Sequence, residues 1–476
     1  MPAPLLDRLF EAPAAEWEAD LAWPAGLPRG LAGTAYWIGP GRFARGSLRY
    51  RHWLDGDGLV FALRFDGGAV HARARFVRGT KFSEEERAGH AVYRTFGTRF
   101  PGDRLKHGIG LESPVNVSAC VFGGHLLAFG EQGLPWALDP VSLETRGLHT
   151  FAGQVNEVTP FAAHAKIDPD TGELLNFGVS FAADRPTLHL FRFDRDGTLR
   201  ARHRMALPYP CTLHDFAISP SYCVFHVSPY LVDVGKLIGE GLTLMESLSW
   251  QPERGSNLIV VDRATGALAA RVPCGRGYCL HLVNAFERDG RLVVDLVEYE
   301  RPVYDQYEVI PDLFTGVSCA VPVRLGLDVA AQSIVTRQEL DYRKAPDFPA
   351  HLAEETGRPY GDVWMLGIGR TGRAGRKFFD ELVHASFDTG HVALSPAGPD
   401  RCFGGEPLVV TDPTVPDRRL VLCHRHDLAS GESAVVAFDG ARVEDGPIAE
   451  MPLPRPIPAL FHGSFAPGAS GRGAGA

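Results

Sequence analysis

The amino-acid sequence predicts an all-β protein folded as a β-propeller, and three observations lead to this prediction. Turn sequences that combine aspartate and glycine recur along the whole chain, which contains 53 glycines and 36 prolines. Short runs of β-branched and other apolar residues flank these turns, as in SNLIVVD and RLVVDLVEYE. The strand-turn-strand unit repeats without an interrupting linker, so the units are expected to pack as blades that bury both faces of each sheet. A large barrel or a pair of β-sandwiches is the alternative.

The recurring turns have the chemistry of β-hairpins. Glycine adopts the positive φ that such turns require, and the aspartate side chain accepts hydrogen bonds from the turn backbone. The turns are residues 65–68, 168–172, 194–197, 262–266, 288–290, 388–390 and 438–440.

Two stretches depart from the strand pattern. Residues 230–250 have apolar residues at mixed helical spacing and are expected on the outside, either as a cap or as a patch that contacts a membrane surface. Residues 346–360 are polar and predict a loop with a helical turn. We expect one domain over residues 1–466 and a flexible tail over residues 467–476, because the tail has the composition of a linker.

Composition narrows the class of protein. The chain of 476 residues is 45% hydrophobic and 22% charged, which is typical of a globular protein. Its net charge of −9 disfavours nucleic acid as a partner, because phosphate binding needs a basic face. The start of the chain does not resemble a secretory signal, and eight scattered cysteines indicate reduced thiols. The sequence therefore predicts a cytoplasmic protein.

Four of the 18 histidines lie in apolar runs at the edges of expected strands: His164, His214, His281 and His462. A lone buried histidine is usually a satisfied core residue. Four on distant segments would meet in a propeller, because each blade sends its innermost strand to the central axis. A further pair, His424 and His426, is interpreted as two polar residues on an exposed strand face rather than as metal ligands.

Several motifs occur in an order that points to a known family. They are GLPRGLAGTAYWIGPGRF at residues 26–43, RHWLDGDGLV at 51–60, RFVRGT at 75–80, and the stretches around the four histidines. Together they resemble the carotenoid cleavage oxygenase family. Its members are non-haem iron enzymes that cut carbon–carbon double bonds in carotenoids, apocarotenoids and related stilbenoids.

The resemblance implies a seven-bladed propeller with Fe(2+) at the top of its axis, beneath a cap of loops and short helices. The four histidines would bind the iron. Three glutamates would each accept a hydrogen bond from the far nitrogen of a ligand histidine, and the matching positions are Glu131, Glu406 and Glu339. No residue beyond this centre is expected to have a catalytic role.

The reaction implied by the resemblance is oxidative cleavage. O₂ and a hydrophobic alkene would be the partners, and two carbonyl compounds would replace the double bond. A carotenoid or apocarotenoid is favoured over a stilbenoid or phenylpropenoid, because no lysine suited to gripping a phenol precedes the Asn116 motif; Lys106 lies in a different loop context. A propeller that only binds, without catalysis, is the third interpretation, and the presence of all four histidines argues against it.

Val117 is a departure from the family pattern. Many members have a small polar threonine after the asparagine, near the open position of the iron, whereas this chain has Asn116-Val117-Ser118. We expect the change to alter O₂ access or substrate placement.

Since such substrates live in membranes, residues 230–250 are the expected site of any peripheral membrane contact.

Overall fold

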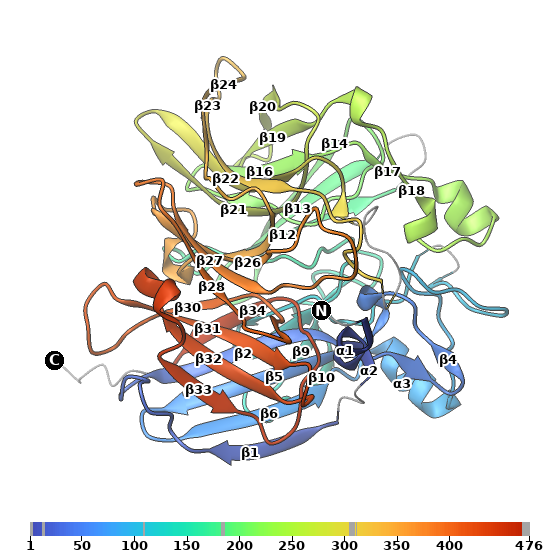
Figure 1. Ribbon diagram of the computed structural model, residues 1–476. Helices are drawn as coiled ribbons and strands as arrows, with labels where there is room; N and C mark the ends of the chain where they lie inside the picture. Colours follow the sequence, from blue (N-terminus) through green and yellow to red (C-terminus); the bar gives the residue numbers. More distant parts are fainter. Residues whose placement is uncertain are drawn as a thin grey trace.

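The computed structural model describes residues 3–11, 15–107, 110–181, 186–303, 310 and 312–468. Within these residues, seven sheets of four or five strands form the seven blades of a β-propeller (Figure 1). The all-β prediction and the propeller prediction are confirmed. Among the described residues, no helix is both long enough and apolar enough to cross a membrane.

The blades are numbered here in chain order, and the strands of each are given from the outermost to the innermost. Blade 1 contains β1 (Trp17–Leu21), β6 (Val70–Phe76), β5 (Asp57–Asp66), β2 (Ala32–Arg42) and β34 (Gly463–Pro467). Blade 2 contains β10 (Thr145–Leu148), β9 (Trp136–Leu138), β8 (His125–Phe129) and β7 (Ser118–Phe122). Blade 3 contains β14 (Leu199–Ala206), β13 (Thr187–Phe193), β12 (Leu174–Ser180) and β11 (Lys166–Ile167). Blade 4 contains β20 (Leu268–Pro273), β19 (Asn257–Asp262), β16 (Tyr222–Val227) and β15 (Ala217–Ile218).

The remaining blades follow the same order. Blade 5 contains β24 (Ser333–Glu339), β23 (Ala320–Asp328), β22 (Arg291–Tyr299) and β21 (Tyr278–Arg288). Blade 6 contains β28 (Val392–Pro396), β27 (Glu381–Ser386), β26 (Asp362–Ile368) and β25 (Ala345–Ala350). Blade 7 contains β33 (Ala449–Pro452), β32 (Ser433–Asp439) and β31 (Arg419–Asp427), with β29 (Arg401–Phe403) and β30 (Leu408–Thr411) both paired to β31.

Short helices and two hairpins lie outside the blades. The helices are α1 (Ala3–Leu6), α2 (Arg8–Glu11), α3 (Thr80–Ala88), η1 (Trp53–Asp55), η2 (Gly235–Gly239), η3 (Met245–Ser247), η4 (Pro252–Arg254), η5 (Ala353–Glu355) and η6 (Gly440–Asp445). The hairpins pair β3 (Ala44–Arg45) with β4 (Leu48–Arg49), and β17 (Tyr230–Val232) with β18 (Leu248–Trp250). In Figure 1, α1, α2 and α3 lie on the right-hand side of the propeller, together with the β17–β18 hairpin.

Pairing between the two ends of the chain closes the ring. β34 is antiparallel to β2, from Gly33 opposite Pro467 to Trp37 opposite Gly463, so red and blue strands are neighbours in Figure 1. The predicted tail begins inside this strand, because Pro467 belongs to β34, and residues 469–476 lie outside the described residues. The division into one domain and a tail stays a prediction.

Most of the predicted hairpin turns are confirmed, and one is wrong. The first six connect antiparallel neighbours, as in the turn from β11 to β12, where the Asp168 side chain accepts a hydrogen bond of 2.8 Å from the Asp170 N–H and Gly172 has a φ of 72°. At 438–440, the Asp439 side chain instead accepts a hydrogen bond from the Ala441 N–H and begins η6. The same Asp-Gly chemistry can therefore cap a helix as well as make a hairpin.

Two other stretches differ from the expectation. The first part of residues 346–360 is the buried innermost strand β25, not a loop. Its two prolines lack the N–H that a central strand needs, but an innermost strand is a sheet edge, and the register shifts between Asp347 and Ala350. On β31, His424 and His426 are buried rather than exposed, with the His424 ring 4.2 Å from the ring of Trp37.

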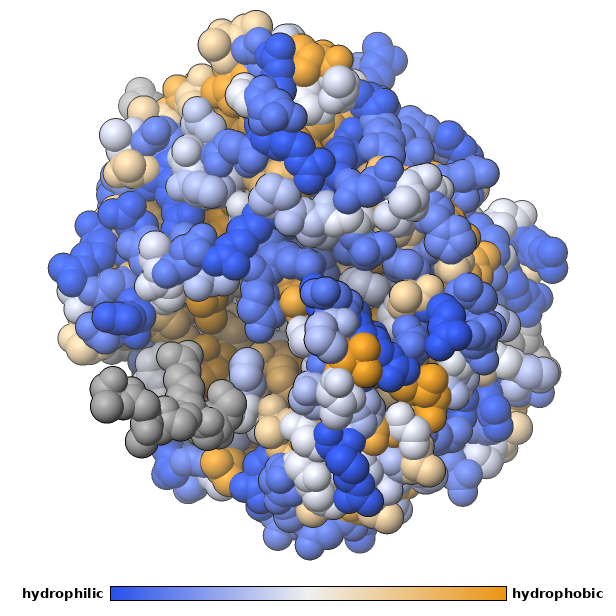
Figure 2. Space-filling view, turned by 90° about the vertical axis from the view of Figure 1, so that its left-hand side faces the viewer, coloured by the Kyte–Doolittle hydropathy of each residue, from blue (hydrophilic) through white to orange (hydrophobic). Residues whose placement is uncertain are grey.

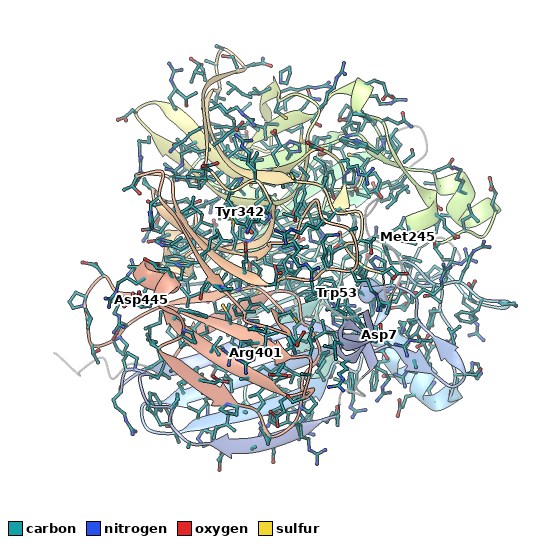
Figure 3. The ribbon with its side chains drawn as sticks, viewed as in Figure 1. Asp7, Trp53, Met245, Tyr342, Arg401 and Asp445 are labelled. Carbon is teal, nitrogen blue, oxygen red and sulfur yellow. The ribbon has the colours of Figure 1, made fainter. Side chains whose placement is uncertain are left out.

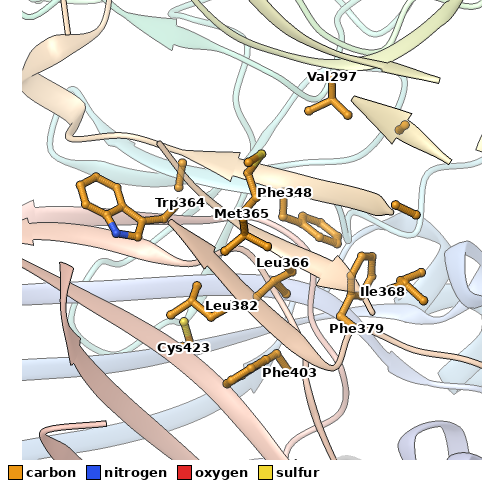
Figure 4. Packing of buried hydrophobic residues seen from close by; sticks show 14 of the residues in the cluster. Val297, Phe348, Trp364, Met365, Leu366, Ile368, Phe379, Leu382, Phe403 and Cys423 are labelled. Atoms are coloured by element: carbon orange, nitrogen blue, oxygen red, sulfur yellow. The ribbon is translucent and has the colours of Figure 1, made fainter. Parts of the chain in front are cut away.

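Apolar clusters between blades hold the sheets together. The largest cluster contains Phe348, Phe379 and Met365, which lie close together in Figure 4. Trp53 joins it from η1 and lies in the interior, with its ring 6.4 Å from Phe10 of the N-terminal helices (Figure 3). The left-hand side of Figure 1 is shown in Figure 2; hydrophilic residues cover most of this face, and a hollow with apolar residues opens below its centre.

A buried ionic cluster anchors α3 to blade 1. Lys81 Nζ lies 2.8 Å from Asp57 Oδ1 and 3.0 Å from Glu85 Oε2, and all three side chains are fully buried. Arg45 Nη2 adds a second cation, 2.8 Å from Asp57 Oδ2. Burial by itself lowers the pKa of Lys81, but the charges of Asp57, Tyr50 and Glu85 outweigh it and raise this pKa above its usual value. The lysine therefore stays charged.

Replacing Lys81 by methionine is expected to lower the free energy of unfolding by about 3–5 kcal/mol, because it leaves two buried carboxylates short of a cation. Unfolding in urea, followed by circular dichroism, measures the effect. Lys236→Met, at an exposed position of η2, is the matched control and should leave stability unchanged. Equal midpoints for the two variants would contradict the assigned role of the cluster.

Candidate metal centre

The innermost strands bring the four histidines together. His164 precedes β11, His214 precedes β15, His281 lies inside β21 and His462 directly precedes β34. These strands belong to four blades and enter the propeller axis from the same end. The histidine nitrogens lie within 4.8 Å of one another, and the His164 and His214 Nε2 atoms are 3.0 Å apart.

Glycines on neighbouring strands allow the segments that precede β34 and β11 to pack closely against those strands. A Cβ atom at Gly39 of β2 would come 2.4 Å from the Leu460 Cα, and one at Gly178 of β12 would come 2.1 Å from the Pro160 oxygen. The close approach is used for hydrogen bonds: the Ile38 N–H donates to the His462 oxygen over 3.0 Å. The backbone hydrogen bond from Ile38 thus helps to fix the position of His462.

Three carboxylates accept hydrogen bonds from, or face, the outer nitrogens of three histidines. Glu131 lies 2.7 Å and 2.9 Å from His214 Nδ1 through its two oxygens. Asp347 Oδ1 lies 2.5 Å from His281 Nδ1, and Glu406 Oε2 lies 3.5 Å from His462 Nδ1. Such partners hold the proton on Nδ1 and turn the lone pair of Nε2 toward the centre.

The prediction for Glu339 is wrong, and Asp347 stands beside His281 instead. Glu339 is an exposed residue at the end of β24, the outermost strand of blade 5, where it bonds Arg337 and Arg343. The sequence does not point to Asp347, because residues 346–360 are polar and predict a loop, and because the resemblance implies a glutamate. The one available signal was an acidic residue among apolar ones in APDFPA.

Burial favours the neutral, metal-binding form of two of the histidines, His164 and His462. Burial lowers the pKa of His164 well below its usual value, and the three other histidines lower it further. For His462, burial outweighs the effect of Glu406 and the pKa is lowered. For His281, burial also lowers the pKa, but Asp347 outweighs it, so the pKa is raised. Asp347, at 2.5 Å, thus outweighs burial at its histidine, whereas Glu406, at 3.5 Å, does not.

Val117 lies next to His462 at the candidate metal centre. It directly precedes β7, the innermost strand of blade 2, and its oxygen accepts a 3.3 Å hydrogen bond from the His462 N–H. Its side chain is 4% exposed and packs in the apolar cluster with Phe129 and Phe161. The structure therefore places Val117 beside a candidate ligand, in an apolar environment.

The surroundings of the histidines differ from side to side. The Phe348 ring lies 5.1 Å from the His462 ring and 5.9 Å from the His281 ring. The side chain of Glu131 keeps 43% of its surface exposed, so open space borders the site there. The site combines an aromatic wall with an accessible side.

The donor set fits a transition-metal ion. The His281 Nε2 atom is buried and has no hydrogen-bond partner, which is costly for a polar atom unless a ligand takes its place. Four imidazole nitrogens suit iron, copper, nickel or zinc, and a site with four ligands leaves iron open positions for other molecules. Fold and site together define a β-propeller metalloprotein with a four-histidine centre.

Comparisons with known proteins identify the family. The chain belongs to the carotenoid cleavage oxygenase family: residues 11–467 match the family described as retinal pigment epithelial membrane protein. It is 30% identical to apocarotenoid-15,15'-oxygenase of Synechocystis sp. over 96% of this chain and 95% of that protein. It is 26% identical to lignostilbene-alpha,beta-dioxygenase isozyme III of Sphingomonas paucimobilis, over 94% of this chain and 93% of that protein. Among solved structures, cobalt-substituted Synechocystis apocarotenoid oxygenase superimposes with a TM-score of 0.87 and 28% identity, over 98% of this chain and 99% of that chain.

Asp347→Asn is expected to weaken Fe(2+) binding by about 10–100-fold, because an amide oxygen carries no charge to strengthen the His281 ring as a ligand. Glu339→Gln is the matched control, since it removes the charge of the carboxylate that the sequence wrongly pointed to. Metal titration of both purified variants measures the difference. Equal affinities for the two would show that Asp347 does not support the metal.

Proposed function

We propose that this protein is a Fe(2+)-dependent dioxygenase that cleaves a carbon–carbon double bond of a carotenoid or apocarotenoid. O₂ supplies both oxygen atoms, and the alkene becomes two carbonyl compounds, so atoms and electrons balance without a further reductant. Bound iron supplies the activation of O₂, and His164, His214, His281 and His462 are the proposed ligands. Glu131, Asp347 and Glu406 would orient three of these rings.

The observation that carries the proposal is the convergence of four buried histidine nitrogens, three of whose rings face carboxylates at their outer nitrogens. A propeller that only bound an organic ligand would have no need of this set. Its burial costs free energy that a bound metal offsets. The non-catalytic alternative is therefore disfavoured.

An apolar, conjugated substrate is supported by the aromatic side chains beside the histidines. From Phe348, ring contacts continue to Phe379 at 5.4 Å and to Trp53 at 6.4 Å, and Trp53 contacts Phe461 at 4.4 Å. A polyene gains free energy by burying its surface against such rings. These residues would hold the alkene by shape and exclude water from it.

The stilbenoid alternative needs a cation that grips a phenol. Lys106 is the lysine that most closely precedes the Asn116 motif, and its Nζ lies 3.7 Å from Glu112 Oε1. This pairing supports a carotenoid or apocarotenoid over a phenol. The relatives include enzymes named for both classes of substrate, so the substrate itself is tested below.

Residues 230–250 are the proposed place of peripheral membrane contact in a protein of the cytoplasm. Ile238 is 40% exposed, and Leu242 and Leu244 are half-buried around it. Lys236 beside them suits an anionic lipid surface. The contact would be shallow, since the rest of the segment packs as the β17–β18 hairpin.

A substrate panel tests the proposed reaction. The purified protein is expected to contain about one iron per chain, to convert an apocarotenal to two carbonyl products, and to leave a hydroxystilbene unchanged, as measured by product mass analysis. His281→Ala should lose both iron and activity. A wild-type protein without metal would refute the proposed enzymatic function. Cleavage of the hydroxystilbene alone would show that the substrate is a stilbenoid and not a carotenoid or apocarotenoid.

Val117→Thr tests the role of the apolar residue beside His462. We expect iron content to stay the same and the rate of cleavage to change by about tenfold, because the threonine hydroxyl can hydrogen-bond within the site. Steady-state rates at several O₂ concentrations separate an effect on O₂ from one on the alkene. An unchanged rate at every concentration would remove Val117 from the proposed site.

A further inference from the structure

One of the four histidines differs from the others in its outer contacts. His214, His281 and His462 each face a carboxylate at Nδ1. The carboxylate nearest to His164 belongs to Asp215, whose Oδ1 lies 3.7 Å from His164 Nδ1. That distance is too long for a hydrogen bond. Among the four candidate ligands, His164 therefore has its nearest carboxylate at the longest distance, slightly beyond the 3.5 Å between His462 and Glu406.

Asp215 is held by other groups. Its Oδ1 lies 2.8 Å from Lys166 Nζ, and its Oδ2 accepts a 3.0 Å hydrogen bond from the Leu282 N–H. The Asp215 side chain is 2% exposed and the Lys166 side chain is 21% exposed. The Lys166 cation thus balances the charge of the buried Asp215 carboxylate, although Asp215 Oδ1 has no hydrogen-bond partner.

The same contacts connect three of the ligand segments. Lys166 follows His164 by two residues, so in an extended chain both side chains point to one side. Asp215 directly follows His214, and Leu282 directly follows His281. A single carboxylate therefore links the innermost segments of blades 3, 4 and 5 beside the metal centre.

Lys166 also changes the charge balance around the centre. Glu131, Asp347 and Glu406 face the histidines as anions, whereas the charges of Asp215 and Lys166 cancel. Without Lys166, a fourth buried carboxylate would carry an uncompensated charge 3.7 Å from a candidate ligand. At that separation in a poorly screened interior, the charge would strengthen the His164 ring as a donor to the metal.

We infer that Lys166 and Asp215 are positioning residues of the metal centre: Lys166 neutralises Asp215, so the carboxylate beside His164 adds no net negative charge to that ligand. This inference rests on the proposed metal-binding function. Lys166 thereby keeps the His164 ring a weaker donor to the metal than an unpaired Asp215 would make it.

Substitutions of the pair should have opposite effects on metal binding. Lys166→Met frees Asp215 to accept a hydrogen bond from His164, so the Kd for the metal should fall by about tenfold. Asp215→Asn leaves the Lys166 cation uncompensated near the centre, so the Kd should rise by about tenfold. Lys166→Met/Asp215→Asn restores a neutral pair and should return the Kd to near the wild-type value. Lys166→Arg should match the wild type.

The experiment uses the full-length protein, freed of metal and titrated with Co(2+) alone. Its absorption spectrum reports both the affinity and the ligand environment, and Lys166→Met should shift the bands, whereas Lys166→Arg should not. Circular dichroism checks that each variant folds, and Lys166→Gln replaces Lys166→Met if the latter does not. A fluorescence-monitored titration provides an independent Kd.

Two outcomes would overturn the inference, and they are distinguishable from failure of the proposed function. If both single variants weaken Co(2+) binding with unchanged bands, the pair is merely structural. If neither variant changes the Kd or the spectrum, the pair does not act on the centre. If the wild-type protein binds no metal at all, the proposed function fails, and the inference fails with it.

Discussion

The pairing of β34 with β2 is the interaction on which the rest of the structure depends. It joins the two ends of a long chain in one sheet, and β34 also contacts β7 and β30 of the neighbouring blades. His462 directly precedes this strand, so the backbone that closes the ring also places a candidate ligand. Each sheet buries its faces only against its neighbours, and an open ring would expose two of them. The segment that closes the ring therefore also contributes one of the four candidate ligands.

Each of four carboxylates near the axis faces a basic side chain: Glu131, Asp347 and Glu406 face histidines, and Asp215 faces Lys166. Asp347 reaches its histidine with a shorter side chain than Glu131 or Glu406. The next residue, Phe348, has a φ of 53°, and the register of β25 shifts at this point. A left-handed conformation in a bulky residue costs about 1–3 kcal/mol. The bond from His281 to Asp347 and the packing of the Phe348 ring offset that cost.

The centre divides into two environments. On one side, Phe348 and Trp53 form part of the largest apolar cluster, which suits an alkene. On another, Lys166 and Asp215 form an ion pair beside His164. The histidines lie where these environments meet, so a hydrophobic substrate and a charged support would reach a bound ion from different directions. Away from the metal centre, Lys81 and Asp57 form another buried ion pair, which anchors α3.

Local patterns in the sequence were enough for the class of fold, because strand alternation and Asp-Gly turns depend on neighbouring residues. Six turns appear where those patterns place them, and Asp439 departs because an aspartate can cap a helix equally well. The four histidines were found through motif order, which carries the family's geometry. The polar character of residues 346–360 predicts a loop, whereas β25 is a buried strand because neighbouring segments in the propeller cover it.

The sequence alone could not show which charged residues contact one another in the folded protein. Glu339 and Asp347 are both acidic and close in the chain, and only the propeller shows that one lies on an outermost strand and the other at the axis. The same holds for Lys166, whose partner Asp215 is in the next blade. By itself the sequence determined the strands, the turns and the residue types that suit a metal. The tertiary structure decided which carboxylate meets which histidine, because blade packing sets distances between segments that the chain leaves far apart.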